Sequence, residues 1–462
     1  MRELPPKPSG GTIGLWCGSD LPGLGDQIAA RVLVRELRHR LGDWQVRTLA
    51  PFGWTRPTRA DGGLVAEPLG ERTPGRVREL VESHHLNVAA PSFPLGADLS
   101  GRYGEPVPAQ EFFTGGLGVE PEALCVAVRV AEEVPAGLVE WMARQPLAAS
   151  VRDEVSRDRL RAAGLSRDVT VVPSPALLVD RLLPTSDMRI RAEQLRQLGQ
   201  LPPDGRSYLV VHVPHTSFTA LRPAVAKTAE LLAIGDVVLL STGAPVPPDT
   251  GWFSVPSDTV LEDRLAVLSG AAAVIAADEH VAAASHAYGR RWVLFDPKGA
   301  DRAAVEQFAS ADRVVARPSG LAAAFRRTLR DDDDRSPKAV RRLDEHLDAV
   351  AVAAERAFAA RGGCVTSRVA ALVEENRALR LAQQRMRDRI VADRHILAER
   401  LLEAGPGGPE LAEERRLHGE LAERHREVLA QLEAERRELA AMRATKLFRW
   451  TRLVRGAYGR LR

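Results

Sequence analysis

The sequence contains few cysteines, and they stand far apart. Cys17, Cys125 and Cys364 are the three cysteines among 462 residues, and no two of them have the spacing of a metal-binding pair. Scattered thiols of this kind suit the reducing cytosol and a protein without a structural metal. We therefore expect no metal site.

The sequence also lacks long apolar runs. The N-terminus, MRELPPKPSGG, has no hydrophobic segment of the kind that a signal peptide requires, and no later run is long enough to cross a bilayer. The 64 Lys and Arg residues nearly balance the 61 Asp and Glu residues, so any basic patch must be local. These absences predict a cytoplasmic protein.

Short apolar runs alternate with helical patterns in two blocks. A chain of 462 residues is too long for one ordinary core, so two domains with additional segments are expected, at 1–185 and 186–335. The pattern predicts α/β domains, each with a doubly wound parallel sheet, that face a cleft. The predicted strands are Thr12–Cys17, Gln45–Ala50, Ala123–Val130, one ending at Val151, Val169–Val172, Tyr208–Val213, Val237–Ser241, Ala271–Ala276, Trp292–Phe295 and Arg313–Ala316.

A histidine lies at one strand end in the second block. The strand Ala271–Ala276 is followed by Asp278-Glu279-His280, a small-residue helix (Val281–Gly289) and another strand. Ligands of open α/β sheets bind at such strand ends, and an imidazole there can give or take a proton near neutral pH. The alternative is a solvated loop histidine.

A glycine-rich loop, GSDLPGLGDQ, follows the first strand and precedes a helix over Gln27–Leu41. Such a loop lets the backbone approach a ligand, and the helix N-terminus favours anions. The loop has neither GxGxxG nor P-loop spacing, so a phosphate contact and a purely structural turn both remain open. Asp26 is placed to cap the helix.

Arg152 follows the strand that ends at Val151 and precedes a helix over Glu154–Ala163. At a strand's carboxyl end, a guanidinium can bind a carboxylate or phosphate through two hydrogen bonds. The alternative is a surface salt bridge with Asp153 or Glu154.

Three segments resemble those of the polysaccharide pyruvyl transferase family. They are Gly23–Leu41, Ser150–Gly164 with the following VTVVPSPALL, and Asp278–Val293. The resemblance covers roughly residues 12–330. It implies two Rossmann-like domains in a GT-B-like arrangement and transfer of a pyruvyl group from phosphoenolpyruvate to a sugar, with no cofactor.

The resemblance also assigns roles to residues. His280 would be the general acid that protonates the methylene carbon of phosphoenolpyruvate. Arg152 would contact the carboxylate or phosphate of that donor, and Asp26 would lie at the mouth of the cleft.

Several positions depart from the family pattern. Asp278 stands where the family has an arginine, Val281 replaces a glycine, and Ser174 replaces an aspartate. A carboxylate at 278 would repel the anionic donor by about 1 kcal/mol or more. Arg290 and Arg291 are the candidates to supply the missing positive charge as substrate-binding residues.

The C-terminal third changes composition. A helical connector is predicted at 336–366, and a heptad pattern at 367–444 predicts a coiled coil that pairs two chains, with Asn376 fixing its register. A single solvated helix is the alternative. The tail, 445–462, has no acidic residue and interleaves arginines with aromatic and aliphatic side chains.

Such a tail suits an anionic membrane surface. We therefore expect a protein held at the inner face of the plasma membrane. Nucleic-acid binding is the rival reading of the tail, but no nucleic-acid-binding module accompanies it, so no nucleic-acid partner is expected.

Three functions fit the sequence. The first is a pyruvyl transferase-like enzyme that uses phosphoenolpyruvate to modify a cell-surface glycan. The second is a GT-B glycosyltransferase that uses a nucleotide sugar. The third is a catalytically degenerate scaffold of a polysaccharide-assembly complex, an alternative favoured by Asp278 and Val281.

Overall fold

The computed structural model describes residues 10–17, 23–50, 67–68, 83–91, 123–134, 139–140, 142–143, 149–213, 215–241, 251–256, 259–328 and 335–360. The chain divides into two units, Met1–Ser367 and Arg368–Arg462, and all described residues belong to the first. The predicted coiled coil and basic tail, and most of the Gly-rich stretch 51–118, lie outside the described residues.

The first sheet is parallel throughout, with strand order β3-β2-β1-β4-β5. Its strands are β1 (Thr12–Trp16), β2 (Gln45–Ala50), β3 (Glu67–Pro68), β4 (Leu86–Ala89) and β5 (Ala123–Cys125). Helix α1 (Leu24–Leu41) connects β1 to β2. The sequence pattern predicted no strand between Pro51 and Gly118, so the structure adds β3 and β4 to the predicted strands.

A short strand pair continues from β5. Val128 bridges to Val151 in β6 (Ser150–Val151), and β6 pairs with β7 (Thr170–Val171) in the parallel direction. Ala127 has a φ of 49°, which interrupts the pairing of the single strand that the sequence predicted over Ala123–Val130. Helix α6 (Glu154–Ala162) connects β6 and β7, with Asp153 as its N-cap.

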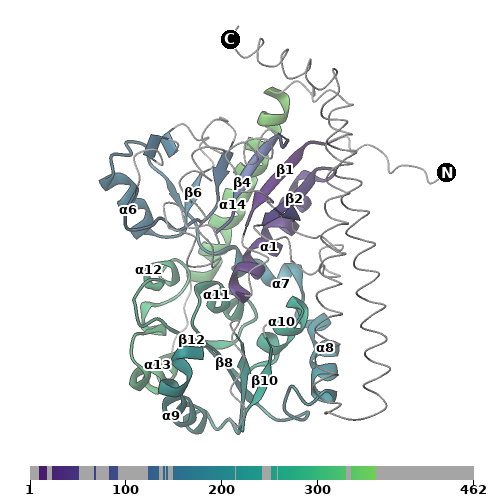
Figure 1. Ribbon diagram of the computed structural model, residues 1–462, viewed down its shortest axis with the longest axis vertical. Coiled ribbons are helices and arrows are strands. Elements are labelled where there is room, and N and C mark those ends of the chain that lie inside the picture. Colours follow the sequence, from purple (N-terminus) through teal and green to yellow (C-terminus); the bar gives the residue numbers. More distant parts are fainter. Residues whose placement is uncertain are drawn as a thin grey trace, which may run out of the picture. The chain divides into compact units, whose positions relative to one another are not determined.

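The second sheet is also parallel, in the order β10-β9-β8-β11-β12-β13. Its strands are β8 (Tyr208–His212), β9 (Asp236–Leu240), β10 (Phe253–Val255), β11 (Ala273–Ala276), β12 (Arg291–Phe295) and β13 (Val314–Val315). In both sheets the strand order reverses beside the first strand, as in doubly wound folds. The predicted α/β class with parallel sheets is therefore confirmed (Figure 1).

Alternate side chains of the second sheet enter two apolar layers. Leu209 and Val211 pack with α9 (His215–Leu231) and α13 (Leu321–Thr328), whereas Val210 faces the layer that contains α8 (Thr185–Gln197), α10 (Leu261–Gly270) and α11 (Glu279–Ala287). Both faces are covered, which is why these strands are apolar along their whole length. We call the part of the chain that contains the first sheet the first half and the part that contains the second sheet the second half. Short helices complete the second half: α12 (Arg302–Val305), η3 (Ala311–Arg313) and η4 (Pro318–Gly320).

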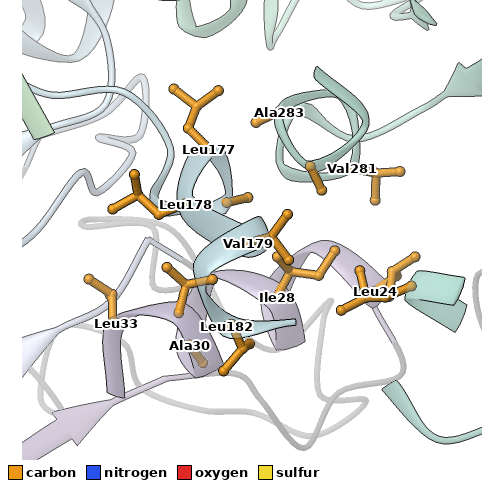
Figure 2. Packing of buried hydrophobic residues seen from close by; sticks show 14 of the residues in the cluster. Leu24, Ile28, Ala30, Leu33, Leu177, Leu178, Val179, Leu182, Val281 and Ala283 are labelled. Carbon is orange, nitrogen blue, oxygen red and sulfur yellow. The ribbon is translucent and has the colours of Figure 1, made fainter. Parts of the chain in front are cut away.

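The two halves share one apolar core. Side chains of α1 interlock with those of η2 (Pro175–Leu178), α7 (Val179–Leu182) and α11 in Figure 2. Leu24, Ile28 and Val281 are fully buried there, and burial of each side chain contributes about 1.5–3 kcal/mol to the stability of the fold. This packing holds the N-termini of α1 and α11 in fixed positions.

Helix α14 (Arg335–Ala360) returns to the first half and packs against α1, β4 and η2 (Figure 1). Its buried stripe is Ala339, Leu343, Leu347, Val350, Ala351, Ala354 and Ala357. His346 Nε2 lies 2.8 Å from Ser150 Oγ, and Asp344 forms ion pairs with Arg40 and Arg181. The helix is therefore part of the first half's core.

If α14 is part of that core, shortening its buried side chains should unfold the protein more easily. We expect Leu347→Ala to lower the free energy of unfolding by about 2–5 kcal/mol because it leaves a cavity. Val352→Ala is the matched control in the same helix, because Val352 is 45% exposed, and it should change that free energy by no more than about 0.5 kcal/mol. Urea unfolding followed by circular dichroism measures both, and equal effects would contradict the packing.

Candidate functional site

The carboxyl ends of β1 and β11 meet through the helices that follow them. A Cβ atom built on Gly25, in the first turn of α1, would lie 2.7 Å from both Cγ and Oδ2 of Asp278, at the N-terminus of α11. Only a glycine allows this approach. The N-termini of two helices therefore converge on one carboxylate.

Asp278 caps α11. Its Oδ1 accepts the backbone N–H of His280 at 2.7 Å and that of Val281 at 3.2 Å. Burial alone would raise the pKa of this carboxyl, but His280, His212 and the two amides outweigh burial and lower it. The structure thus maintains a negative charge at the helix N-terminus.

His280 occupies the first turn of α11 and is buried. Its Nδ1 lies 2.7 Å from Ser174 Oγ, which also accepts the backbone N–H of Ala176 as the N-cap of η2. This contact occupies Nδ1, so Nε2 is the ring nitrogen left to face a reacting group. Among the described residues Nε2 has no hydrogen-bond partner, so this nitrogen is the one available for proton transfer.

Arg152 lies beside this histidine but is surrounded by carboxylates. Its Nε is 3.0 Å from Asp153 Oδ2, its Nη1 is 2.9 Å from Glu279 Oε1, and its Nη2 is 2.8 Å from Asp301 Oδ1. Nη2 also donates to the Ala300 carbonyl at 3.0 Å. Burial opposes the charge of Arg152, but these carboxylates raise its pKa above the usual value. The predicted anion clamp is a buried ion cluster between the two halves.

Glu279 is the most unusual acid of the site. Oε1 forms the ion pair with Arg152 and lies 3.6 Å from His280 Nδ1, while Oε2 has no hydrogen-bond partner among the described residues. Burial raises the pKa of Glu279 to about 8, although Arg152 lowers it in part. Asp153 and Asp301 already balance the charge of Arg152, so Glu279 can hold a proton at neutral pH.

His212, at the end of β8, is a site residue that the sequence analysis did not select. It is 3% exposed, and neither ring nitrogen has a hydrogen-bond partner within the described part of the chain. Burial lowers the pKa of His212 to about 4, against an opposing effect of Asp278. His212 pairs with Ala276 across β8 and β11, and this pairing is the signal that places it beside Asp278.

Three predicted site residues are placed differently from the expectation. Asp26 is buried in the first turn of α1 and is not its N-cap residue, because the helix begins at Leu24 after Gly23. Arg290 and Arg291 lie beyond the C-terminal end of α11, about 13 Å along the helix from Asp278. They therefore do not compensate the charge of Asp278, and the suggestion that they do is wrong.

Within the described ranges, no group of three or more His, Cys, Asp or Glu side chains is arranged to hold a metal ion. In the same ranges, no helix has both the length and the apolar character of a membrane span.

No protein-family model and no curated protein matches the chain. Among solved structures, it is similar to the UDP-GlcNAc 2-epimerase of Neisseria meningitidis bound to UDP-GlcNAc, at 9% identity and a TM-score of 0.45, over 74% of this chain and 97% of that one. The UDP-GlcNAc 2-epimerase of Methanocaldococcus jannaschii gives 11% identity and a TM-score of 0.46, over 72% of this chain and 98% of that one.

A third similar structure is the ADP-heptose lps heptosyltransferase II of E. coli, at 14% identity and a TM-score of 0.36, over 75% of this chain and 99% of that one. All three TM-scores are below 0.5.

The contact between Gly25 and Asp278 predicts a coupled pair of substitutions. Gly25→Ala should lower the free energy of unfolding by about 1–3 kcal/mol, because the new methyl group overlaps the Asp278 carboxylate. In an Asp278→Gly background the same change should cost measurably less, because the carboxylate is gone. Urea unfolding of the four proteins gives the coupling energy, and strictly additive effects would rule out the contact.

The raised pKa of Glu279 predicts a pH-dependent stability. The unfolded carboxyl ionises near its ordinary value of 4.5, whereas the folded one holds its proton to about 8. Between these values the native state binds more protons, so this contribution to stability is lost as pH rises. It amounts to no more than about 5 kcal/mol.

Glu279→Gln should abolish this contribution. We expect the free energy of unfolding of the wild type to fall, relative to that of the variant, between pH 5 and pH 8. Parallel curves for the two proteins in urea unfolding over this range would show that Glu279 is ionised in the folded protein at neutral pH.

Proposed function

We propose that this protein is a group-transfer enzyme of the polysaccharide pyruvyl transferase type, with His280 as its proton-transfer residue. The observation that supports this proposal is the convergence of the three segments that carry the family resemblance. Gly25 of the first lies against Asp278, Ser174 of the second is hydrogen-bonded to His280, and Arg152 is paired with Glu279. Segments this far apart in the chain meet in one place. We call this group of Gly25, Arg152, Ser174, Asp278, Glu279 and His280 the polar corner.

The corner suits the proton transfer that this reaction requires. The imidazolium form of His280 donates its Nε2 proton to the methylene carbon of phosphoenolpyruvate and becomes the neutral ring, and the adjacent carbon becomes an oxocarbenium-like centre. Two hydroxyl groups of a sugar add to that carbon while its bond to the phosphate oxygen breaks. One hydroxyl proton returns to His280, and the other leaves with inorganic phosphate. Ser174 fixes the ring so that Nε2 is the donor nitrogen.

The substrates in this proposal are phosphoenolpyruvate and a glycan acceptor, with no cofactor. A GT-B-like placement of the two sheets belongs to the same proposal. So do a homodimer formed through 367–444 and attachment of 445–462 to the anionic inner face of the plasma membrane, which would bring a cytoplasmic enzyme close to lipid-linked glycans.

A second candidate is a scaffold that has kept the fold and lost the reaction. One observation favours it: the charges that would bind an anionic donor are already satisfied. Asp278 occupies two amides of the α11 N-terminus, and three carboxylates surround Arg152. A donor anion must therefore compete with the protein's own acids.

Titration of phosphoenolpyruvate, UDP and GDP by calorimetry distinguishes these functions. We expect phosphoenolpyruvate to bind, and phosphate release in the presence of cell-surface glycans to fall by about 10²–10⁴-fold in His280→Gln, because the general acid is lost. His286→Gln is the matched control, because His286 lies at the other end of α11 against Trp292.

Other outcomes contradict the proposal in different ways. Binding of UDP or GDP without phosphoenolpyruvate would indicate a nucleotide-sugar glycosyltransferase. Binding of none of the three would support the scaffold. Unchanged phosphate release in His280→Gln would remove His280 from the reaction.

A further inference from the structure

The Asp278 carboxylate lies where a bound anion would lie. A helix N-terminus presents unpaired backbone N–H groups and the positive end of the helix dipole, so it is a ready site for phosphate or carboxylate. In α11 the amides of His280 and Val281 are the donors at that place, and both bind Asp278 Oδ1. The protein thus supplies its own anion.

The second helix strengthens this arrangement. The first turn of α1 approaches the same carboxylate so closely that Gly25 has no room for a side chain. One negative charge therefore serves two helix N-termini, and an incoming anion would meet both the charge and the lack of space.

His212 gives an independent indication that the corner takes a ligand. It is 3% exposed, it lies beside Asp278, and its two ring nitrogens have no hydrogen-bond partner among the described residues. A buried polar ring without partners costs free energy unless a bound group completes its hydrogen bonds. The unsatisfied ring of His212 is therefore an observation, independent of the helix N-termini, that favours a hydrogen-bonding ligand at this corner.

We infer that the Asp278 carboxylate is a built-in anion that competes with acidic groups of the substrate for the N-terminus of α11, and so sets the anion affinity of the site. The identity of the natural anion, phosphoenolpyruvate, rests on the proposed function. The competition itself does not, because any phosphate or carboxylate group would meet it.

Two substitutions separate charge from occupancy. Asp278→Asn removes the charge and keeps an oxygen that can cap the helix, whereas Asp278→Gly also frees the two amides and preserves most of the capping stability. Asp236→Asn is the matched control. It removes one carboxylate at the amino end of β9, where Asp236 pairs with Arg206. The site lies instead at the carboxyl ends of the strands of the same sheet.

Calorimetric titration with inorganic phosphate and with phosphoenolpyruvate tests the inference. We expect Asp278→Asn to bind inorganic phosphate about tenfold more tightly than the wild type, Asp278→Gly at least as tightly as Asp278→Asn, and Asp236→Asn like the wild type. Circular dichroism and urea unfolding of each variant establish that it is folded.

The two proposals fail in distinguishable ways. Unchanged phosphate affinity in both folded Asp278 variants overturns the built-in anion, even if the wild type turns over phosphoenolpyruvate. Tighter phosphate binding in both variants supports it, even if His280-dependent transfer is never observed and the proposed function fails. Tighter binding in Asp236→Asn as well would overturn it, because the effect would then be one of net charge alone.

Discussion

The meeting of the α1 and α11 N-termini depends on apolar packing beside it. Leu24 and Ile28 of α1 and Val281 of α11 are buried against η2 and α7, and this shared apolar core fixes the two helices. Gly25 then allows the backbone of α1 to reach Asp278. The polar corner is held at the edge of a core that spans both halves, so its geometry cannot relax without loss of that packing.

Charge in the corner is arranged around acids more than bases. Arg152 is held by Asp153, Glu279 and Asp301. Burial, and after it the neighbouring carboxylates, raise the pKa of Glu279 to about 8 although Arg152 lowers it in part. A buried ion cluster of this kind is costly to desolvate and costly to break. It therefore serves to fix the position of His280 between two halves, and any ligand must bind within the constraints that the cluster imposes.

Much of this arrangement could be predicted from the sequence. Continuous apolar runs predicted strands such as β8 and β11. The polar residues after the predicted strands identified Asp278 and His280, which follow β11, and Arg152, which follows β6, as residues at carboxyl ends. The predicted start of α1 was wrong because Leu24 and Gly25 already belong to the helix before Asp26. Arg290 and Arg291 do not compensate the charge of Asp278, because the full length of α11 separates them from that residue.

Other features depended on contacts that a sequence pattern does not contain. The partner of Glu279 is Arg152, and the partner of His280 is Ser174, which is 106 residues away. His212 became a site residue only because β8 and β11 are neighbours in the sheet. Strands β3, β4 and β10 are two to four residues long, too short to show a periodic pattern.

The return of α14 to the first half also affects how the chain is made. Ser150 binds His346, which is 196 residues later, and Arg40 pairs with Asp344, which is 304 residues later. These partners are synthesised long after the first strands have emerged from the ribosome. We therefore expect the N-terminal sheet to keep an apolar face exposed until α14 has been synthesised. Folding of this half is then completed late during translation or after it.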